Sequence, residues 1–125
     1  MLTNFFNLPA HKRRLLMQLF LILLAVGLVL ALIPSPDTGG GIEVNDKLMH
    51  TTAFLAYAIL LDMASSRDFW RFQVPILLGY GALIEVLQSF TPWRMFSLWD
   101  FAADALGILL YWLLFRMLLK VKAAT

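Results

Sequence analysis

The chain contains no cysteine among its 125 residues. Disulfides, thiol nucleophiles and cysteine-ligated metal sites are therefore excluded. Charged residues are also scarce, at 14%, whereas a soluble domain carries roughly a quarter. Hydrophobic residues make up 61% of the chain, and the mean hydropathy is +0.78. Because so few charges are available to cover a water-facing surface, we expect one compact domain whose surface largely faces lipid.

Four apolar segments predict an all-α membrane protein, a four-transmembrane-helix bundle. They cover about residues 15–33, 48–63, 72–90 and 101–119, with a basic N-terminal stretch at 1–14 and a C-terminal stretch at 120–125. The first segment is long enough to cross the hydrocarbon at about 1.5 Å per residue. A secretory signal peptide is the alternative, but this run exceeds the usual roughly 7–15 apolar residues and lacks a small-residue cleavage site. We therefore predict that the first segment is retained as a membrane helix.

Lysine and arginine are unevenly distributed over the predicted bundle. One side has Lys47 and Arg94 only. The other side has eight: Lys12, Arg13, Arg14, Arg67, Arg71, Arg116, Lys120 and Lys122. The positive-inside rule places the eight-residue side in the cytoplasm, so both termini are predicted to be cytoplasmic, N-in/C-in. Since topology accounts for these residues, the net charge of +2 does not require nucleic acid as a partner.

The remaining polar residues collect at the predicted outer end of the second, third and fourth helices. They are Asp46, Lys47, His50, Glu85, Gln88, Arg94, Asp100 and Asp104. Spacings of three or four residues put the pairs within each helix on one face. Glu85 and Asp104 lie roughly 7 Å inside their helix ends, where a carboxylate costs a few kcal/mol unless it meets partners or water. We therefore predict a shallow pocket here, to which the first helix contributes mainly packing, and we expect Asp62, near the opposite end, to be solvated.

The chemistry of this predicted pocket stays open at the level of sequence. The chain has no His-Glu-x-x-His, Gly-x-Ser-x-Gly or Walker motif. One histidine among several carboxylates suits a divalent cation or acid–base catalysis. The same residues could instead form ion pairs that only hold the helices together. No particular cofactor or metal is predicted, and whether the protein is an enzyme is undecided.

The order and spacing of these residues resemble the VanZ-like family of bacterial membrane proteins. The resemblance covers roughly residues 43–114. It rests on Asp46-Lys47-x-x-His50, Glu85-x-x-Gln88, Pro92-x-Arg94 and Asp100-x-x-x-Asp104-x-x-Gly107. The last polar position is commonly Asn in the family, so Asp104 adds a potential negative charge. The resemblance implies a multi-pass protein of the bacterial cytoplasmic (inner) membrane with a link to glycopeptide antibiotic tolerance, and it names no reaction.

Three interpretations of function follow. The first is a protein that binds or processes an envelope lipid or a lipid-linked cell-wall intermediate, with Lys47, His50 and Arg94 as phosphate ligands. The second is a membrane-embedded enzyme in which Glu85 or His50 is the general base and a metal takes part. The third is a structural or assembly partner of an envelope complex. In each case the expected surroundings are membrane lipids, and self-association is possible.

Overall fold

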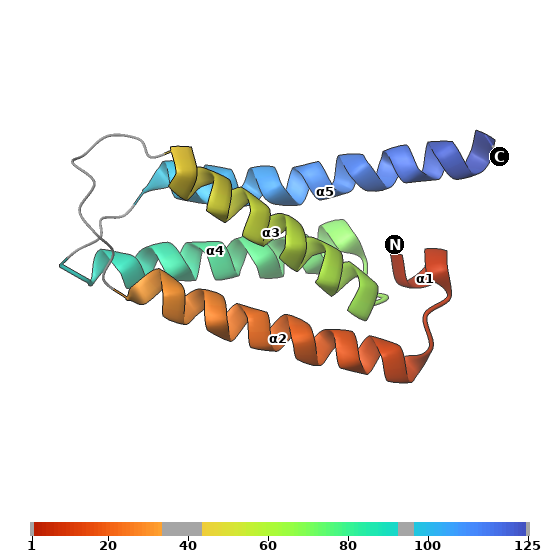
Figure 1. Cartoon of the computed structure of the whole chain (residues 1–125), viewed down its shortest axis with the longest axis horizontal. Coiled ribbons are helices and arrows are strands. Elements are labelled where there is room, and N and C mark those ends of the chain that lie inside the picture. The colour runs from red at the N-terminus through yellow and green to blue at the C-terminus, as the bar shows by residue number, and fades with distance from the viewer. Residues whose placement is uncertain (1, 34–43, 93–96, 125) are drawn as a thin grey trace.

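The computed structural model describes residues 2–33, 44–92 and 97–124. These residues form helices only, four of them long: α1 (Leu2–Phe6), α2 (Ala10–Leu32), α3 (Val44–Ala64), η1 (Phe69–Gln73), α4 (Val74–Ser89) and α5 (Leu98–Ala124). The long helices α2, α3, α4 and α5 run along one another, and α1 lies at the end where the C-terminus also lies (Figure 1). The prediction of an all-α fold is therefore confirmed for the described residues.

Local sequence explains where several helices begin and end. Helix α2 follows Pro9, and it stops at Ile33, whose extended backbone is the conformation favoured before a proline. Asn7 adopts a positive φ of 52°, which asparagine tolerates better than most residues, and so reverses the chain between α1 and α2. The π-helical turn η1 leads directly into α4, where Pro75 sits in the first turn and needs no backbone donor.

Three stretches are long and apolar enough to cross a membrane: α2, the continuous stretch Phe69–Ser89, and α5. Helix α2 also exposes a row of large apolar side chains, namely Leu15, Leu19, Leu21, Ile22, Val26, Val29 and Leu30. A contiguous exposed apolar surface of this kind is typical of a helix that faces lipid or a partner. The prediction of a multi-pass membrane protein is thus supported by three candidate spans among the described residues.

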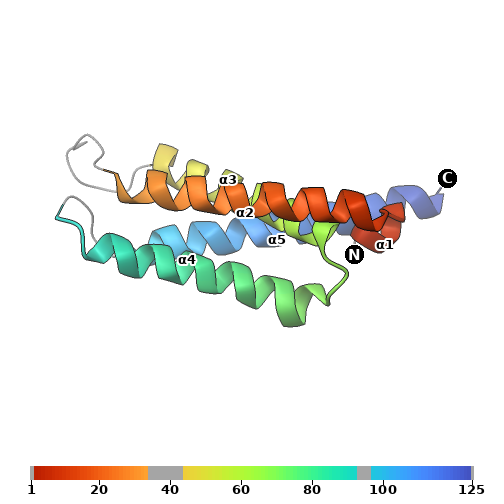
Figure 2. The same cartoon turned by 90° about the horizontal axis from the view of Figure 1, so that it is seen from below.

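Helix α3 is not one of these three candidates, because its first turns carry Asp46, Lys47 and His50 and its end carries Asp62. It is instead the central helix of the bundle. It packs extensively on α5 and α2, and it also contacts α1, α4 and η1 (Figures 1 and 2). A helix covered by its neighbours can hold polar side chains that would be costly in lipid.

Helices α3 and α5 approach each other closely at Gly107. A Cβ atom at this position would lie within clash distance of the Thr51 carbonyl oxygen and 2.9 Å from the Leu55 backbone nitrogen. The Thr51 hydroxyl also donates to the Ala103 carbonyl across the same contact, at 3.1 Å. Small residues commonly allow such close backbone approach between membrane helices. The contact fixes the register that brings the start of α3 beside the start of α5.

The end of the bundle near the N-terminus differs from the sequence-based expectation. Asp62 is completely buried, so the prediction of a solvated residue was wrong. Its carboxylate accepts hydrogen bonds from the Leu2 backbone N–H at 3.1 Å and from the Tyr111 hydroxyl. Thr3 donates to the backbone carbonyls of Asp62 and Met63, at 2.9 and 2.6 Å. The stretch predicted as a basic tail therefore contains α1, which folds back over the end of α3.

Helix boundaries also shift relative to the predicted segments. Helix α3 begins at Val44 rather than about residue 48, and the third segment begins with η1 at Phe69 rather than about residue 72. Helix α5 continues to Ala124, through Lys120 and Lys122, which are good helix formers. The predicted segments were drawn around apolar runs, whereas the backbone hydrogen bonds continue through the polar residues that flank them.

Candidate functional site

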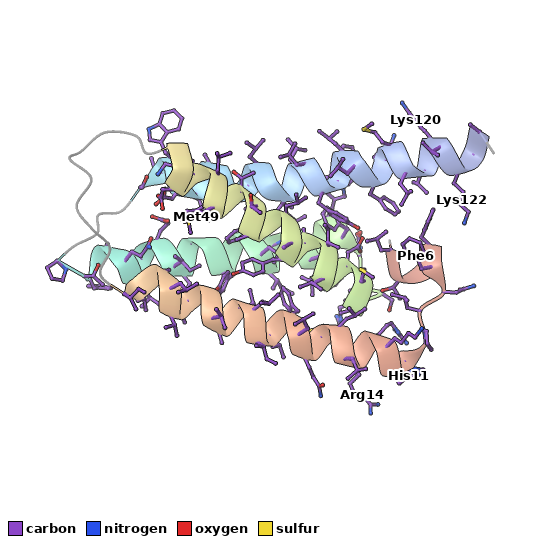
Figure 3. All side chains as sticks on the ribbon, viewed as in Figure 1. Phe6, His11, Arg14, Met49, Lys120 and Lys122 are labelled. Atoms are coloured by element: carbon purple, nitrogen blue, oxygen red, sulfur yellow. The ribbon has the colours of Figure 1, made fainter. Side chains whose placement is uncertain are left out.

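The polar residues singled out in the sequence come from three helix ends that meet at one end of the bundle. Asp46, Lys47 and His50 lie in the first turns of α3, and Asp100 and Asp104 lie in the first turns of α5. Glu85 and Gln88 are in the last turns of α4. The opposite end of the bundle carries basic residues, among them His11, Arg14, Lys120 and Lys122 (Figure 3). Met49, which is labelled in the same view, marks the end with the polar residues. The bundle therefore has one acidic and one basic end.

An outer layer of this site is organised around Lys47. The Lys47 ammonium donates to the carboxylate of Asp100 and, at 3.3 Å, to that of Asp46. The Nε2 atom of His50 lies 3.8 Å from Asp100 Oδ2 and 4.0 Å from Asp46 Oδ1. Lys47 and Asp46 stay partly exposed, whereas Asp100 is buried. The lysine thus neutralises part of the negative charge of the carboxylates in the more exposed layer of the site.

A deeper layer joins His50 to two fully buried carboxylates. His50 Nδ1 lies 2.7 Å from Asp104 Oδ1, a hydrogen-bonding distance. Glu85 Oε2 accepts a hydrogen bond from the Ser97 backbone N–H at 3.1 Å. Asp104 and Glu85 both have 0% exposure. Among the described residues, Asp104 Oδ2 and Glu85 Oε1 have no hydrogen-bond partner, which is costly for buried acceptors.

Gln88 extends the deeper layer toward α2. Its amide nitrogen donates to the Ala31 carbonyl of α2 at 2.8 Å. Its amide oxygen is buried and has no hydrogen-bond partner among the residues that the structure describes. Arg94, the other predicted member of the site, lies outside the described residues, so seven of the eight predicted positions are placed.

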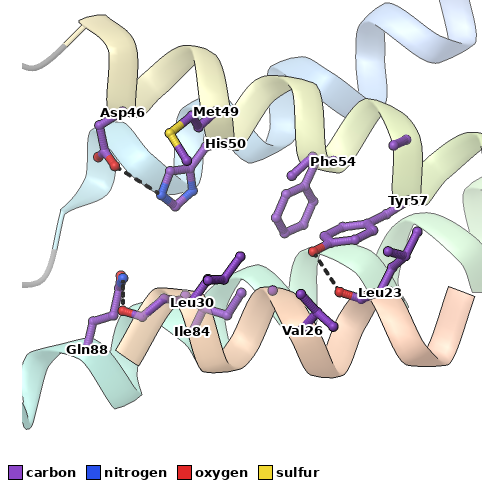
Figure 4. Close-up of a pocket in the computed structure, with 14 residues that line it drawn as sticks. Leu23, Val26, Leu30, Asp46, Met49, His50, Phe54, Tyr57, Ile84 and Gln88 are labelled. Carbon is purple, nitrogen blue, oxygen red and sulfur yellow. Dashed lines mark hydrogen bonds and ion pairs between the residues drawn. The ribbon is translucent and has the colours of Figure 1, made fainter. Parts of the chain in front are cut away.

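An elongated cavity of about 330 Å³ begins at these residues and runs between α2, α3 and α4 (Figure 4). Asp46, His50 and Gln88 line its polar part. The rest of its wall is mainly apolar: Leu23, Val26, Gly27, Leu30, Ala31, Met49, Ala53, Phe54, Ala56, Tyr57 and Ile84. The cavity therefore combines a long apolar body with polar groups at one end.

Helix α2 has a larger role in this site than packing alone. Its backbone carbonyls at Leu23 and Leu24 accept hydrogen bonds from the hydroxyls of Tyr57 and Tyr80. At Gly27 a Cβ atom would collide with the Tyr57 hydroxyl, so glycine allows α2 to approach this ring. The expectation that helix one contributes mainly packing overlooked these contacts, since backbone acceptors leave no trace in the amino-acid pattern. Gly27, the glycine within the apolar first helix, was the one sequence feature that could have indicated a close approach to another helix.

Two groups of three side chains have the geometry to hold a cation. They are Asp46, His50 and Asp100 in the outer layer, and His50, Glu85 and Asp104 in the deeper layer. In each group the potential ligand atoms lie within 4.8 Å of one another. The same deeper group has the composition of an acid–base site, with a histidine held by a carboxylate. Geometry therefore keeps both a cation site and proton transfer open.

The fold and the site together define a class: an all-helical protein with three helices that could cross a membrane and a buried acidic cluster at one end of the bundle. Comparison with protein-family models finds no match. Comparisons with curated proteins and with solved structures find no match either. The resemblance to the VanZ-like family consequently stays a prediction.

Proposed function

We propose that the chain is a four-span protein of the bacterial cytoplasmic membrane, with α3 as the fourth crossing and both termini in the cytoplasm. Three apolar candidate spans support this topology, and so do Arg14, Lys120 and Lys122, which lie near the end that holds both termini (Figures 1 and 3). Helix α3 has 21 residues, about 31 Å at 1.5 Å per residue, which matches the hydrocarbon thickness. Its polar residues make contacts inside the bundle, so lipid need not solvate them.

Within that topology, the function supported best is binding of an amphiphilic lipid at the outer leaflet. The observation that carries this proposal is the shape and lining of the cavity: an apolar body between α2, α3 and α4 that ends at Asp46, His50 and Gln88. Ligand sites of this kind bury an apolar group and fix its orientation with a few polar contacts. An acyl or prenyl chain fits the apolar body, and a polar head group fits the other end.

The polar end favours a head group that donates hydrogen bonds. Lys47 is engaged by two carboxylates and His50 by Asp104, so neither is available as the simple phosphate ligand that the sequence suggested. The buried oxygen of Gln88 is instead an acceptor without a partner among the described residues. Hydroxyl and ammonium groups complement such acceptors. A lipid-linked cell-wall intermediate, with its sugar hydroxyls, belongs to this class of ligand.

Mass spectrometry of lipids retained by the purified protein tests this proposal. The wild type is expected to retain a defined amphiphile. Ala53 lines the cavity, so the larger side chain of Ala53→Phe occupies part of its volume, and this variant is expected to lose the lipid. The control is Ala82→Phe, an exposed position on α4 that does not line the cavity. If all three proteins retain the same lipids in the same amounts, those lipids surround the bundle and the proposal is wrong.

An enzyme is the second candidate, and the His50–Asp104 contact of 2.7 Å favours it. A carboxylate that holds a histidine ring is a common arrangement for a general base. This candidate predicts that Asp104→Asn leaves the amount of retained lipid unchanged and abolishes its conversion to product. Pure binding predicts that the wild type and this variant both return the added lipid unaltered.

A further inference from the structure

We propose that His50, Glu85 and Asp104 form a site for a divalent transition-metal cation of the Mn²⁺ or Zn²⁺ type. This inference goes beyond lipid binding and does not depend on it. The three side chains come from α3, α4 and α5, so a cation bound here would join three helices. The potential ligand atoms already lie within 4.8 Å of one another. Neighbouring ligands of a tetrahedral Zn²⁺ lie about 3.4 Å apart, so side-chain shifts of about an ångström complete the site.

Unpartnered buried oxygens distinguish this group from an ordinary acidic cluster. Glu85 Oε1 and Asp104 Oδ2 have no hydrogen-bond partner among the described residues, and both side chains have 0% exposure. Gln88 Oε1 is also unpartnered within the described part of the chain, although its residue is 1% exposed. Gln88 lies one helical turn from Glu85. Its side chain extends into the cavity that His50 also lines (Figure 4). Buried acceptors without donors in the described part of the chain are stabilised by a bound cation or by water.

Charge supports a cation rather than water alone. Four carboxylates, those of Asp46, Glu85, Asp100 and Asp104, face Lys47 and His50 among the described residues. Lys47 bonds to Asp46 and Asp100 in the outer layer, so His50 is the only cationic side chain beside Glu85 and Asp104 among the residues that the structure describes. A divalent ion supplies two positive charges where a buried carboxylate is most expensive.

The ligand types indicate which ion is preferred. One imidazole nitrogen with carboxylate and amide oxygens suits Mn²⁺ or Zn²⁺ better than Ca²⁺ or Mg²⁺, which favour oxygen-only sites. The position of His50 also suits ligation through Nδ1, which faces Asp104. Its Nε2 then points toward Asp100 Oδ2 at 3.8 Å, and metal-bound histidines usually direct their second nitrogen to such a carboxylate.

Electron paramagnetic resonance with Mn²⁺ tests the site in the full-length protein, purified in detergent without a histidine tag and stripped of metal with EDTA. We expect one Mn²⁺ per chain, bound below about 100 µM, a range typical of specific sites, with coupling to an imidazole nitrogen. The chain has only two histidines, His11 and His50. A nitrogen coupling that survives His11→Gln therefore comes from His50, and this control leaves the site itself untouched because His11 is exposed on α2.

Further variants locate the oxygen ligands. Asp104→Asn is expected to weaken Mn²⁺ binding at least about 10-fold, the lower bound for changes around metal sites, whereas Asp68→Asn at an exposed position is expected to leave it unchanged. The proposal is overturned if no Mn²⁺ binds at about 1 mM, a concentration at which even weak protein sites fill. It is also overturned if His11→Gln removes the nitrogen coupling. Should Asp104→Asn fail to fold, the stoichiometry and the His11→Gln spectrum still decide the question.

Discussion

The imidazole of His50 and the carboxylate of Asp104 meet across the α3–α5 interface, with 2.7 Å between Nδ1 and Oδ1, although the two residues are 54 positions apart in the chain. The Gly107 contact, one turn further along α5, brings the two backbones close enough for this bond. Helix packing and site chemistry are therefore linked. Any change that separates α3 from α5 also separates the histidine from its carboxylate.

A double-mutant cycle on this pair should show strong coupling. Under metal-free conditions, His50→Gln and Asp104→Asn each remove one partner of a partly buried, charge-assisted hydrogen bond. We expect a coupling free energy of about 1–3 kcal/mol, measured by reversible unfolding in detergent. Pairing Asp104→Asn with His11→Gln should be additive, because His11 is exposed near the opposite end. A His50–Asp104 coupling no larger than about 0.6 kcal/mol, the average for hydrogen bonds between membrane helices, would contradict the prediction.

Gly107→Ala should destabilise the bundle because its new methyl group would meet backbone atoms of Thr51 and Leu55, which cannot rotate away. We expect a loss of about 1–3 kcal/mol in the free energy of unfolding, the usual cost of overpacking. The matched control is Gly79→Ala on α4, where nothing lies within 4 Å of the added atom. That variant should be neutral or more stable by up to about 1 kcal/mol, because alanine favours the helix. Equal effects of the two substitutions would show that the α3–α5 contact is looser than described.

Asp62→Leu should loosen the N-terminal segment. Leucine is larger than aspartate and carries no acceptor, so the substitution leaves the Leu2 N–H and the Tyr111 hydroxyl without their partner. We expect a loss of about 1–3 kcal/mol in stability and faster tryptic cleavage after Lys12 and Arg13. Asp68→Leu, at an exposed position, serves as the control and should change neither quantity. Unchanged cleavage in Asp62→Leu would mean that α1 is held by its other contacts alone.

The site shows which features a sequence can predict. Asp46 and His50 share one helix face, as do Asp100 and Asp104, so helical spacing alone indicates that each pair points the same way. Their position at one end of the predicted bundle then indicates that the pairs meet, and the structure brings them together. The Lys/Arg asymmetry predicts in addition that this end lies on the outer side of the membrane. Whether the group binds anything is not encoded in spacing, and it stays a prediction.

Asp62 shows where such reasoning fails. Its burial depends on Leu2 and on Tyr111, which lie 60 and 49 positions away in the chain. Leu2 approaches because α1 folds back, and Tyr111 approaches because α5 packs on α3. Two nearby arginines, Arg67 and Arg71, suggested a solvated charge, but Asp62 is buried and accepts hydrogen bonds from a backbone N–H and a tyrosine hydroxyl. The carbonyls of α2 were missed for a similar reason, since every residue has one and only tertiary packing decides which are used.

The topology can be tested with single cysteines, because the chain has none of its own. In the four-span, N-in/C-in arrangement, Pro92→Cys should react with a membrane-impermeant maleimide in intact cells, whereas Ser66→Cys and Ala123→Cys should react only after permeabilisation. All three positions are exposed in the structure, so a lack of labelling cannot be attributed to burial within the protein. If α3 does not cross and only the three apolar stretches do, an N-in chain exposes Ser66 and Ala123 outside and Pro92 inside. The three positions therefore give opposite labelling patterns for the two arrangements, and external reaction of Ser66→Cys with protection of Pro92→Cys would reject the four-span proposal.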